Sequence, residues 1–486
     1  MSQPSAPPTT GSPAGTQRHH SARDRAGRRT PHPALALTVL AASMFLSALD
    51  AFVVNVALTP IGRGVGETSL SRLSWILNGY AIVYAALLVP AGRLVDRHGH
   101  KAGFLLGLGV FTAASLGAAA SGNLWVLIAF RCLQAVGAAI LTPASLGLVL
   151  TTAPPHKVAA YVQIWAASGS LAAAAGPVVG GLLVQLAWQW IFLLNLPIGI
   201  LALVLAQRLL PAGRRISDAR LPDLLGGALV VVGIGALALG LVQAPEWGWG
   251  AWQTVGSFVA AAAALALCAV RSARHAVPVV DLNLLRDRVF AWANAATVIF
   301  YTAFAIQLLG LTLWLQQTWH WSPVETGLGV APGPATVFAA ALLAQRLARR
   351  IPVGAVAAMG SLLVALGIAW IALHVSGSPQ YATAVLPGWM IAGVGVGLAL
   401  PTLISSATSG LPKDQGAAGS AIVTMAGQLG TVLGVSILVI VLAAAGPTGS
   451  VHAFTVARWI SVGVMAVSGL AALGITPRRP SPHPAR

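Results

Sequence analysis

Long apolar runs separated by short polar connectors make up most of the chain between residues 34 and 476. An α-helix needs about 20 apolar residues to cross the hydrocarbon core of a bilayer, and the runs are of this order. Gly, Pro or charged residues between them indicate that the chain turns there. The 14 expected spans are residues 34–58, 73–92, 102–121, 124–150, 158–186, 190–210, 223–243, 252–271, 289–317, 326–345, 352–375, 381–407, 416–445 and 455–476. The pattern predicts an all-α integral membrane protein.

The positions of Lys and Arg test this count independently, because cytoplasmic connectors carry an excess of positive residues. Of the 28 Lys and Arg residues, 24 fall in the two tails and in the connectors after spans 2, 4, 6, 8, 10 and 12. The opposite connectors carry Arg63 and Arg72, while Arg458 starts the last span and Arg131 lies inside span 4. A missed span would invert this alternation downstream of the error. We therefore expect an even number of spans in a cell membrane, with both termini cytoplasmic.

Composition agrees with a membrane protein and narrows the function. The chain has 57% hydrophobic and 8% charged residues, unlike a soluble domain. The net charge of +17 is spread over connectors, so no nucleic-acid partner is expected. Cys132 and Cys268 have no metal-ligand or disulfide spacing, and no Gly-Lys pair offers a phosphate-binding loop. We expect no metal or cofactor, and energy from an ion gradient or a separate subunit.

One acidic residue lies in the middle of a span. Ten of the eleven Asp and Glu residues are in tails, in connectors or at span edges, whereas Asp50 lies inside the first apolar run. Ser43 and Ser47 share its helical face, which we expect to point toward protein or water. A charge at the bilayer centre costs at least about 2.5 kcal/mol on the insertion scale, so an acid kept there is a candidate functional group.

Arg131 is the corresponding embedded base. Span 1 leaves the cytoplasm and span 4 returns to it, and a rise of about 1.5 Å per residue places Asp50 and Arg131 at similar depth. Gln134 lies on the same helical face as Arg131. Two interpretations remain open: a static ion pair that joins two helices, and a proton site whose carboxylate titrates when the guanidinium moves away.

The connector between spans 2 and 3 is short, charged and bounded by glycines, and reads GRLVDRHGHK from Gly92 to Lys101. It resembles the loop after helix 2 of the major facilitator superfamily, G-x-L-a-D-r-x-G-r-k. The resemblance implies a cytoplasmic gating loop that pairs with a neighbouring helix end and holds the outward-open state. A solvated charged turn is the alternative. The matching residues are Gly92, Leu94, Asp96, Arg97, Gly99 and Lys101, and His100 replaces a usual Arg.

Span 5 contains Gly176-Pro177-Val-Val-Gly180-Gly181, which resembles the antiporter motif of exporters in this superfamily. Ala172 stands where a further Gly is expected. Small residues also let helices approach closely, so a packing role would be physically sufficient. The motif favours export over import.

The resemblance extends over nearly all of residues 34–476 and is closest to the 14-helix drug:proton antiporter branch, the multidrug and antibiotic efflux type. It includes LDAFVVNVALTPI in span 1, SPVETGLGVAPGP before and within span 10, and the helix-4 motif around Arg131, in which Ala135 replaces a usual Gly. The second copy of the gating loop, at residues 345–352, departs from the pattern because Arg349 replaces its Asp.

The resemblance implies the major facilitator fold, with two six-helix bundles and two extra central helices. The expected divisions are a disordered cytoplasmic tail, an N-terminal bundle, a linking pair of helices, a C-terminal bundle and a second cytoplasmic tail, at residues 1–33, 34–210, 211–288, 289–476 and 477–486.

Polar and aromatic residues at membrane depth are candidates for the lining of a central substrate cavity, because the family places their spans around it. Each would also suit an interhelical hydrogen bond. They are Tyr80, Tyr84, Gln134, Gln163, Tyr301, Gln307, Gln316, Thr424 and Gln428.

Three classes of function follow from these features. We expect a monomeric transporter that exports small amphipathic or hydrophobic molecules, such as drugs or antibiotics, in exchange for protons by alternating access. A proton-coupled uptake carrier for a small metabolite would keep Asp50 and Arg131 without needing the antiporter motif. A membrane enzyme or receptor would need a His or Cys cluster or a sizeable soluble domain, and no connector exceeds about 20 residues.

Overall fold

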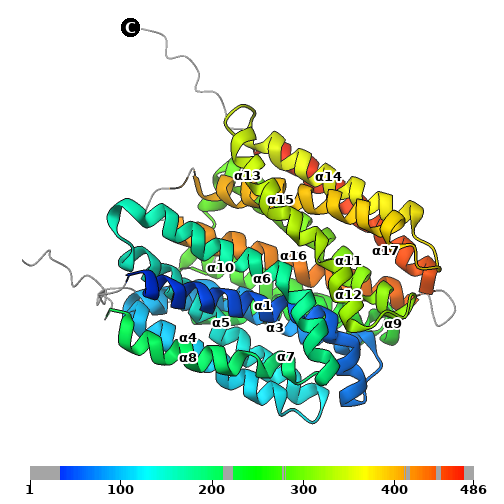
Figure 1. Ribbon diagram of the computed structural model, residues 1–486, viewed down its shortest axis with the longest axis horizontal. Coiled ribbons are helices and arrows are strands. Elements are labelled where there is room, and N and C mark those ends of the chain that lie inside the picture. Colours follow the sequence, from blue (N-terminus) through cyan, green and yellow to red (C-terminus); the bar gives the residue numbers. More distant parts are fainter. Residues whose placement is uncertain are drawn as a thin grey trace, which may run out of the picture.

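The structure, a computed structural model, describes residues 33–211, 223–275, 278–279, 281–409, 411, 416–444 and 450–475. These residues contain 14 helical spans that are long and apolar enough to cross a membrane, which confirms the predicted count. The spans lie side by side with their axes running in broadly the same direction (Figure 1). The tails predicted at residues 1–33 and 477–486 lie outside the described residues, apart from Pro33.

The first eight spans run from α1 to α10, because spans 2 and 6 are each interrupted once. The interruptions fall at Ser74 and Leu194. The elements are α1 (Pro33–Val65), α2 (Leu70–Leu73), α3 (Trp75–His98), α4 (His100–Ala119), α5 (Leu124–Thr152), η1 (Pro155–Lys157), α6 (Val158–Leu186), α7 (Trp190–Leu193), α8 (Asn195–Leu209), α9 (Leu224–Trp247) and α10 (Trp252–Arg274).

The last six spans begin after a 3₁₀ turn. Asp287 caps the first of them by accepting a hydrogen bond from the backbone N–H of Phe290 at 2.8 Å. Ser322 and Glu325 form a reciprocal capping box at the start of span 10. The elements are η2 (Leu284–Arg286), α11 (Arg288–Gln317), α12 (Pro323–Val330), α13 (Pro332–Leu347), α14 (Val353–His374), η3 (Tyr381–Val385), α15 (Leu386–Ser409), α16 (Gly416–Ala444) and α17 (Ser450–Leu473).

Helices α1 to α8 pack mainly on one another, as do α11 and α13 to α17, whereas α12 packs mainly against α6 (Figure 1). Helices α9 and α10 pair with each other, and α9 also contacts α3 and α16. Asp223 caps the start of α9 and accepts a hydrogen bond from Arg271 Nε of α10 at 2.6 Å, which joins the two helices. The packing is compatible with two six-helix bundles and a linking pair, and the exact division of the chain stays a prediction.

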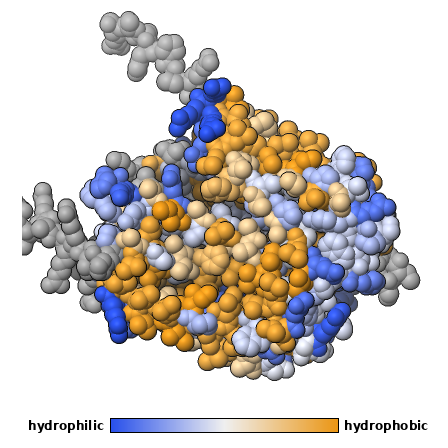
Figure 2. Space-filling model, in the orientation of Figure 1, coloured by the Kyte–Doolittle hydropathy of each residue, from blue (hydrophilic) through white to orange (hydrophobic). Residues whose placement is uncertain are grey.

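The outer surface of the helix assembly is apolar. Large side chains such as Leu186 and Leu470 are about 70% exposed or more, which an aqueous surface seldom tolerates over a wide area. Figure 2 shows hydrophobic residues over the broad middle of one face and hydrophilic residues gathered toward the ends of the helices. This surface suits a lipid environment, as expected of a multi-pass membrane protein.

Candidate functional site

Asp50 lies within α1 and is only 2% exposed. Ser43 and Ser47, which share its helical face, are also buried. The face that the sequence predicted to turn away from lipid therefore does point into protein.

Arg131 lies on α5 and is 1% exposed. Asn123 caps this helix by accepting a hydrogen bond from the N–H of Val126 at 3.0 Å, so Arg131 lies about two turns from the helix start. Its Nη1 donates to Asp50 Oδ2 in a buried ion pair. The guanidinium carbon also lies 4.4 Å from the ring centroid of Tyr80. The similar depth inferred from the sequence thus brings the two charges together, while their role in proton coupling stays a prediction.

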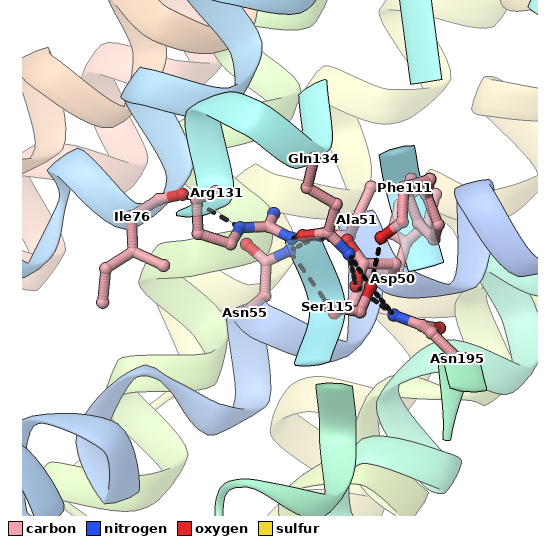
Figure 3. A network of polar contacts seen from close by, with 10 residues as sticks. Asp50, Ala51, Asn55, Ile76, Phe111, Ser115, Arg131, Gln134 and Asn195 are labelled. Atoms are coloured by element: carbon pink, nitrogen blue, oxygen red, sulfur yellow. Dashed lines mark hydrogen bonds and ion pairs between the residues drawn. The ribbon is translucent and has the colours of Figure 1, made fainter. Parts of the chain in front are cut away.

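The other oxygen of Asp50 accepts two neutral hydrogen bonds (Figure 3). Gln134 Nε2 donates to Oδ1 at 2.9 Å, and Asn195 Nδ2 donates to the same atom at 2.8 Å. Both amides also donate to Ser115 Oγ, at 2.8 Å from Gln134 and 3.2 Å from Asn195. Ser115 in turn donates to the backbone carbonyl of Phe111 at 2.8 Å. Three helices, α1, α5 and α8, therefore meet at the Asp50 carboxylate, and α4 joins them through the contacts of Ser115 with the two amides.

The Asp50 carboxylate is the acceptor in each of its hydrogen bonds. Gln134 Oε1 accepts from Arg131 at 2.6 Å, so its amide nitrogen must face Asp50 and Ser115. Each oxygen of Asp50 then receives donors only, an arrangement that suits an ionised carboxylate and leaves no acceptor for a proton on the acid. Because Asp50 and Arg131 are almost completely buried, breaking this network would leave an unpaired charge in a low-dielectric setting.

Ser115 and Asn195 are the parts of this site that the sequence did not identify. Ser115 looks like any small residue of an apolar helix, where a hydroxyl commonly donates to the carbonyl four residues earlier. Asn195 carried a usable signal, since it is an amide inside the apolar stretch IFLLNLPIG, but no spacing relates it to Asp50. Their meeting depends on the packing of α8 against α1 and of α4 against α5 and α8.

The predicted gating loop is a very tight link between α3 and α4. Gly99 is the only residue between the two helices, and its φ of 98° favours glycine. Asp96 pairs with His100 at 3.4 Å within the link. Lys101 Nζ donates to the carbonyls of Gln207 and Leu210 at 2.8 and 2.7 Å, which caps the end of α8. These contacts describe the loop in this conformation, and its gating role stays a prediction.

The glycines of the antiporter motif allow α6 to approach two neighbouring helices very closely. A Cβ on Gly176 would lie 2.6 Å from the Cβ of Phe52, and one on Gly180 would lie 3.1 Å from the carbonyl oxygen of Val53. A Cβ on Gly181 would collide with the carbonyl of Pro323 in α12. The motif thus touches α1 just after Asp50 on one side and α12 on the other.

The residues proposed to line a cavity fall into different surroundings. Tyr80 and Tyr84 stack with centroids 6.0 Å apart, and Tyr84 Oη lies 3.2 Å from Thr142 Oγ1. Gln316 Nε2 donates across to the carbonyl of Val56 in α1 at 2.9 Å. Gln134 belongs to the Asp50 network. Gln307 is buried, Tyr301, Thr424 and Gln428 are partly buried, and Gln163 is exposed.

Comparison with known proteins gives the family. The model of the Major Facilitator Superfamily matches residues 40–435 and 293–486. The tetracenomycin C resistance and export protein of Streptomyces glaucescens is 32% identical over 413 residues, which cover 84% of this chain and 76% of that protein. The puromycin resistance protein of Streptomyces alboniger is 33% identical over 461 residues, 90% of each chain. The chain belongs to the major facilitator superfamily, a family of transporters rather than enzymes.

A solved structure supports the fold. A POT family transporter in complex with a thioalcohol-conjugated peptide superposes with a TM-score of 0.68 at 16% identity, over 91% of this chain and 96% of that one.

The multidrug resistance protein Stp of Mycobacterium tuberculosis is 32% identical over 414 residues, covering 84% of this chain and 76% of that protein. The names of these relatives describe drug and antibiotic resistance or export proteins.

Proposed function

We propose that the chain exports small amphipathic or hydrophobic molecules, such as drugs or antibiotics, in exchange for protons. The observation that carries this proposal is the buried Asp50, held by three donors from α5 and α8 at the depth of the membrane. A group that is ionised in one conformation and loses its donors in another will take up a proton in the second. The names of the relatives supply the substrate class.

The proposed cycle alternates between two conformations. In the conformation of this structure, helices of the two halves are in contact at one end of the molecule. Near that end, Gly181 of α6 faces Pro323 of α12, and Gly327 of α12 faces Pro177 of α6. The Gln316–Val56 hydrogen bond joins α11 to α1 at the same end. The bias of Lys and Arg assigns this end to the outside and both termini to the cytoplasm. An ionised Asp50 in this state fits an antiporter that has released its proton inside.

The proposal also gives roles to Arg131, to the gating loop and to the cavity candidates. Separation of Asp50 from Arg131 would let the acid be protonated from outside, and the loop from Gly92 to Lys101 would hold the outward-open state. The cavity candidates would contact the substrate. The alternative of an uptake carrier gains no support from the glycine contacts of span 5 or from the relatives.

The test is gradient-driven transport in inside-out vesicles that contain the full chain. Puromycin, tetracenomycin C and ethidium are offered singly, and the vesicle interior is acidified. We expect at least one compound to accumulate in the lumen and to leave it again when an uncoupler is added. Accumulation that persists with the uncoupler, or accumulation only when the gradient is reversed, would contradict proton-driven export.

The close contact between α6 and α12 gives a second expectation. Leucine at Gly327 cannot fit against the Pro177 carbonyl, and overpacking costs about 1–3 kcal/mol, a population shift of roughly fivefold to 150-fold. Gly327→Leu should therefore favour the outward-open state. In a background without Cys132 and Cys268, a cysteine at Gln316 should react faster with an impermeant maleimide from outside. Gly109→Leu, which meets open space, is the control. Equal labelling in both variants would show that this contact does not close the outer end.

A further inference from the structure

A second arginine is buried in the membrane part of the chain. Arg458 is 4% exposed. The apolar pattern placed it at the start of the last span, but α17 begins at Ser450, so Arg458 lies about two turns inside the helix. It is therefore an intramembrane charge, and the expectation that it lies at the span edge is wrong.

The guanidinium of Arg458 lies over an aromatic ring, and no acidic side chain among the described residues neutralises it. The guanidinium carbon lies 4.3 Å from the ring centroid of Trp314 of α11, and this ring packs edge-on against Phe454 at 5.4 Å. Both Nη1 and Nη2 are buried without a hydrogen-bond partner in the described part of the chain. No ion pair among the described residues includes Arg458.

Two neighbouring groups on α11 share this lack of partners. Trp314 Nε1 and Gln307 Nε2 are both buried and unpaired. Ser461 donates to the carbonyl of Ala303 at 2.8 Å and Ser468 to that of Ala296 at 3.0 Å, which sets the antiparallel register of α17 and α11. In this register Gln307 is level with Arg458, and Trp314 lies about two turns further toward the end of α11.

A comparison with Arg131 shows that Arg458 lacks hydrogen-bond acceptors. Both arginines lie about two turns from the starts of their helices and both stack on an aromatic ring. Arg131 has Asp50 and Gln134 as acceptors, whereas Arg458 has none among the described residues. An uncompensated buried charge is costly, and residues of this kind inside a membrane mark functional sites by default.

We propose that Arg458 is the centre of an oxyanion-binding site, with the indole N–H of Trp314 as a further donor. All the unpaired groups are N–H donors, so the ligand that completes them must be an acceptor with negative charge. A guanidinium fork fits the two oxygens of a carboxylate or phosphate. The next residue, Trp459, is 45% exposed, so α17 borders lipid beside the site. The oxyanion can come from an anionic phospholipid headgroup or from a soluble organic acid.

Binding to the purified full chain in an uncharged detergent separates these sources. Dihexanoylphosphatidylglycerol is compared with uncharged dihexanoylglycerol, and benzoate with benzamide, by isothermal titration. We expect at least one anion to bind more tightly than its uncharged partner. Binding of the phospholipid alone identifies a headgroup site, and binding of benzoate identifies a site for soluble acids. Equal binding within both pairs would overturn the proposal.

Variants tie the binding to this residue. Arg458→Gln should weaken binding of the anion roughly tenfold or more, as expected for a lost charge-assisted hydrogen bond. Arg346→Gln removes an exposed positive charge instead and should leave the affinity unchanged. If Arg458→Gln cannot be purified, Arg458→Lys and Trp314→Phe decide, because loss of the fork or of the indole N–H should each weaken binding. Unaltered affinity in these variants would refute the site. The titrations use no proton gradient, so their outcome is independent of the proposed antiport.

Discussion

Asp50→Asn should abolish proton-driven accumulation while leaving downhill exchange partly intact. A gradient of two pH units supplies about 2.7 kcal/mol for each proton exchanged, enough to concentrate a substrate about 100-fold. Asparagine keeps the shape of the side chain and an acceptor for Arg131, but it has no group that takes up and releases a proton in the working pH range. The accumulation ratio should therefore fall from about 100 toward one.

The measurement uses the inside-out vesicles and whichever compound they accumulate best. Asp50→Glu should retain some accumulation because it keeps a titratable carboxyl group. Glu246→Gln, which removes an exposed acid that accepts a hydrogen bond from Ser71 at 2.7 Å, is the matched control and should transport normally. Substrate-induced proton release from the purified protein gives a second readout. Equal release from wild type and Asp50→Asn would place the proton site elsewhere.

The sequence was sufficient for the number of spans, because hydropathy and the alternation of Lys and Arg are independent consequences of crossing a membrane. It was less accurate for helix ends. Span 1 extends to Val65 and α17 begins at Ser450, in both cases beyond the apolar run. Polar residues near the interface continue the helical hydrogen bonding although they lower the hydropathy. This is why Arg458 was placed at an edge.

The candidate site was predictable only where charge made it conspicuous. Asp50 and Arg131 stand out because embedded charges are rare and because their depths can be counted from the ends of their spans. Gln134 followed from the helical face of Arg131. Ser115 and Asn195 are neutral, and their approach to Asp50 depends on how α4 and α8 rotate about their axes. Hydropathy carries little information about such rotation.

The two interpretations of the Asp50–Arg131 pair predict different behaviour when both charges are removed. Arg131→Met alone leaves a buried carboxylate without its counterion, which costs about 3–5 kcal/mol. Adding Asp50→Asn removes that charge as well, and neutral replacements of a buried ion pair are often as stable as the pair itself. The double variant should therefore regain most of the melting temperature that Arg131→Met loses.

Transport should not recover with stability. If Asp50 is the proton site, the double variant Asp50→Asn, Arg131→Met is folded but has nothing to titrate, so accumulation against a gradient stays near one while melting returns close to the wild-type value. If the pair only joins α1 to α5, the same variant should recover both properties. Measuring melting temperature and gradient-driven accumulation on the same four proteins, the wild type, the two single variants and the double variant, therefore decides between a proton site and a structural ion pair. Because Gln134 and Asn195 remain in place throughout, the comparison isolates the two charges from the amides that hold them.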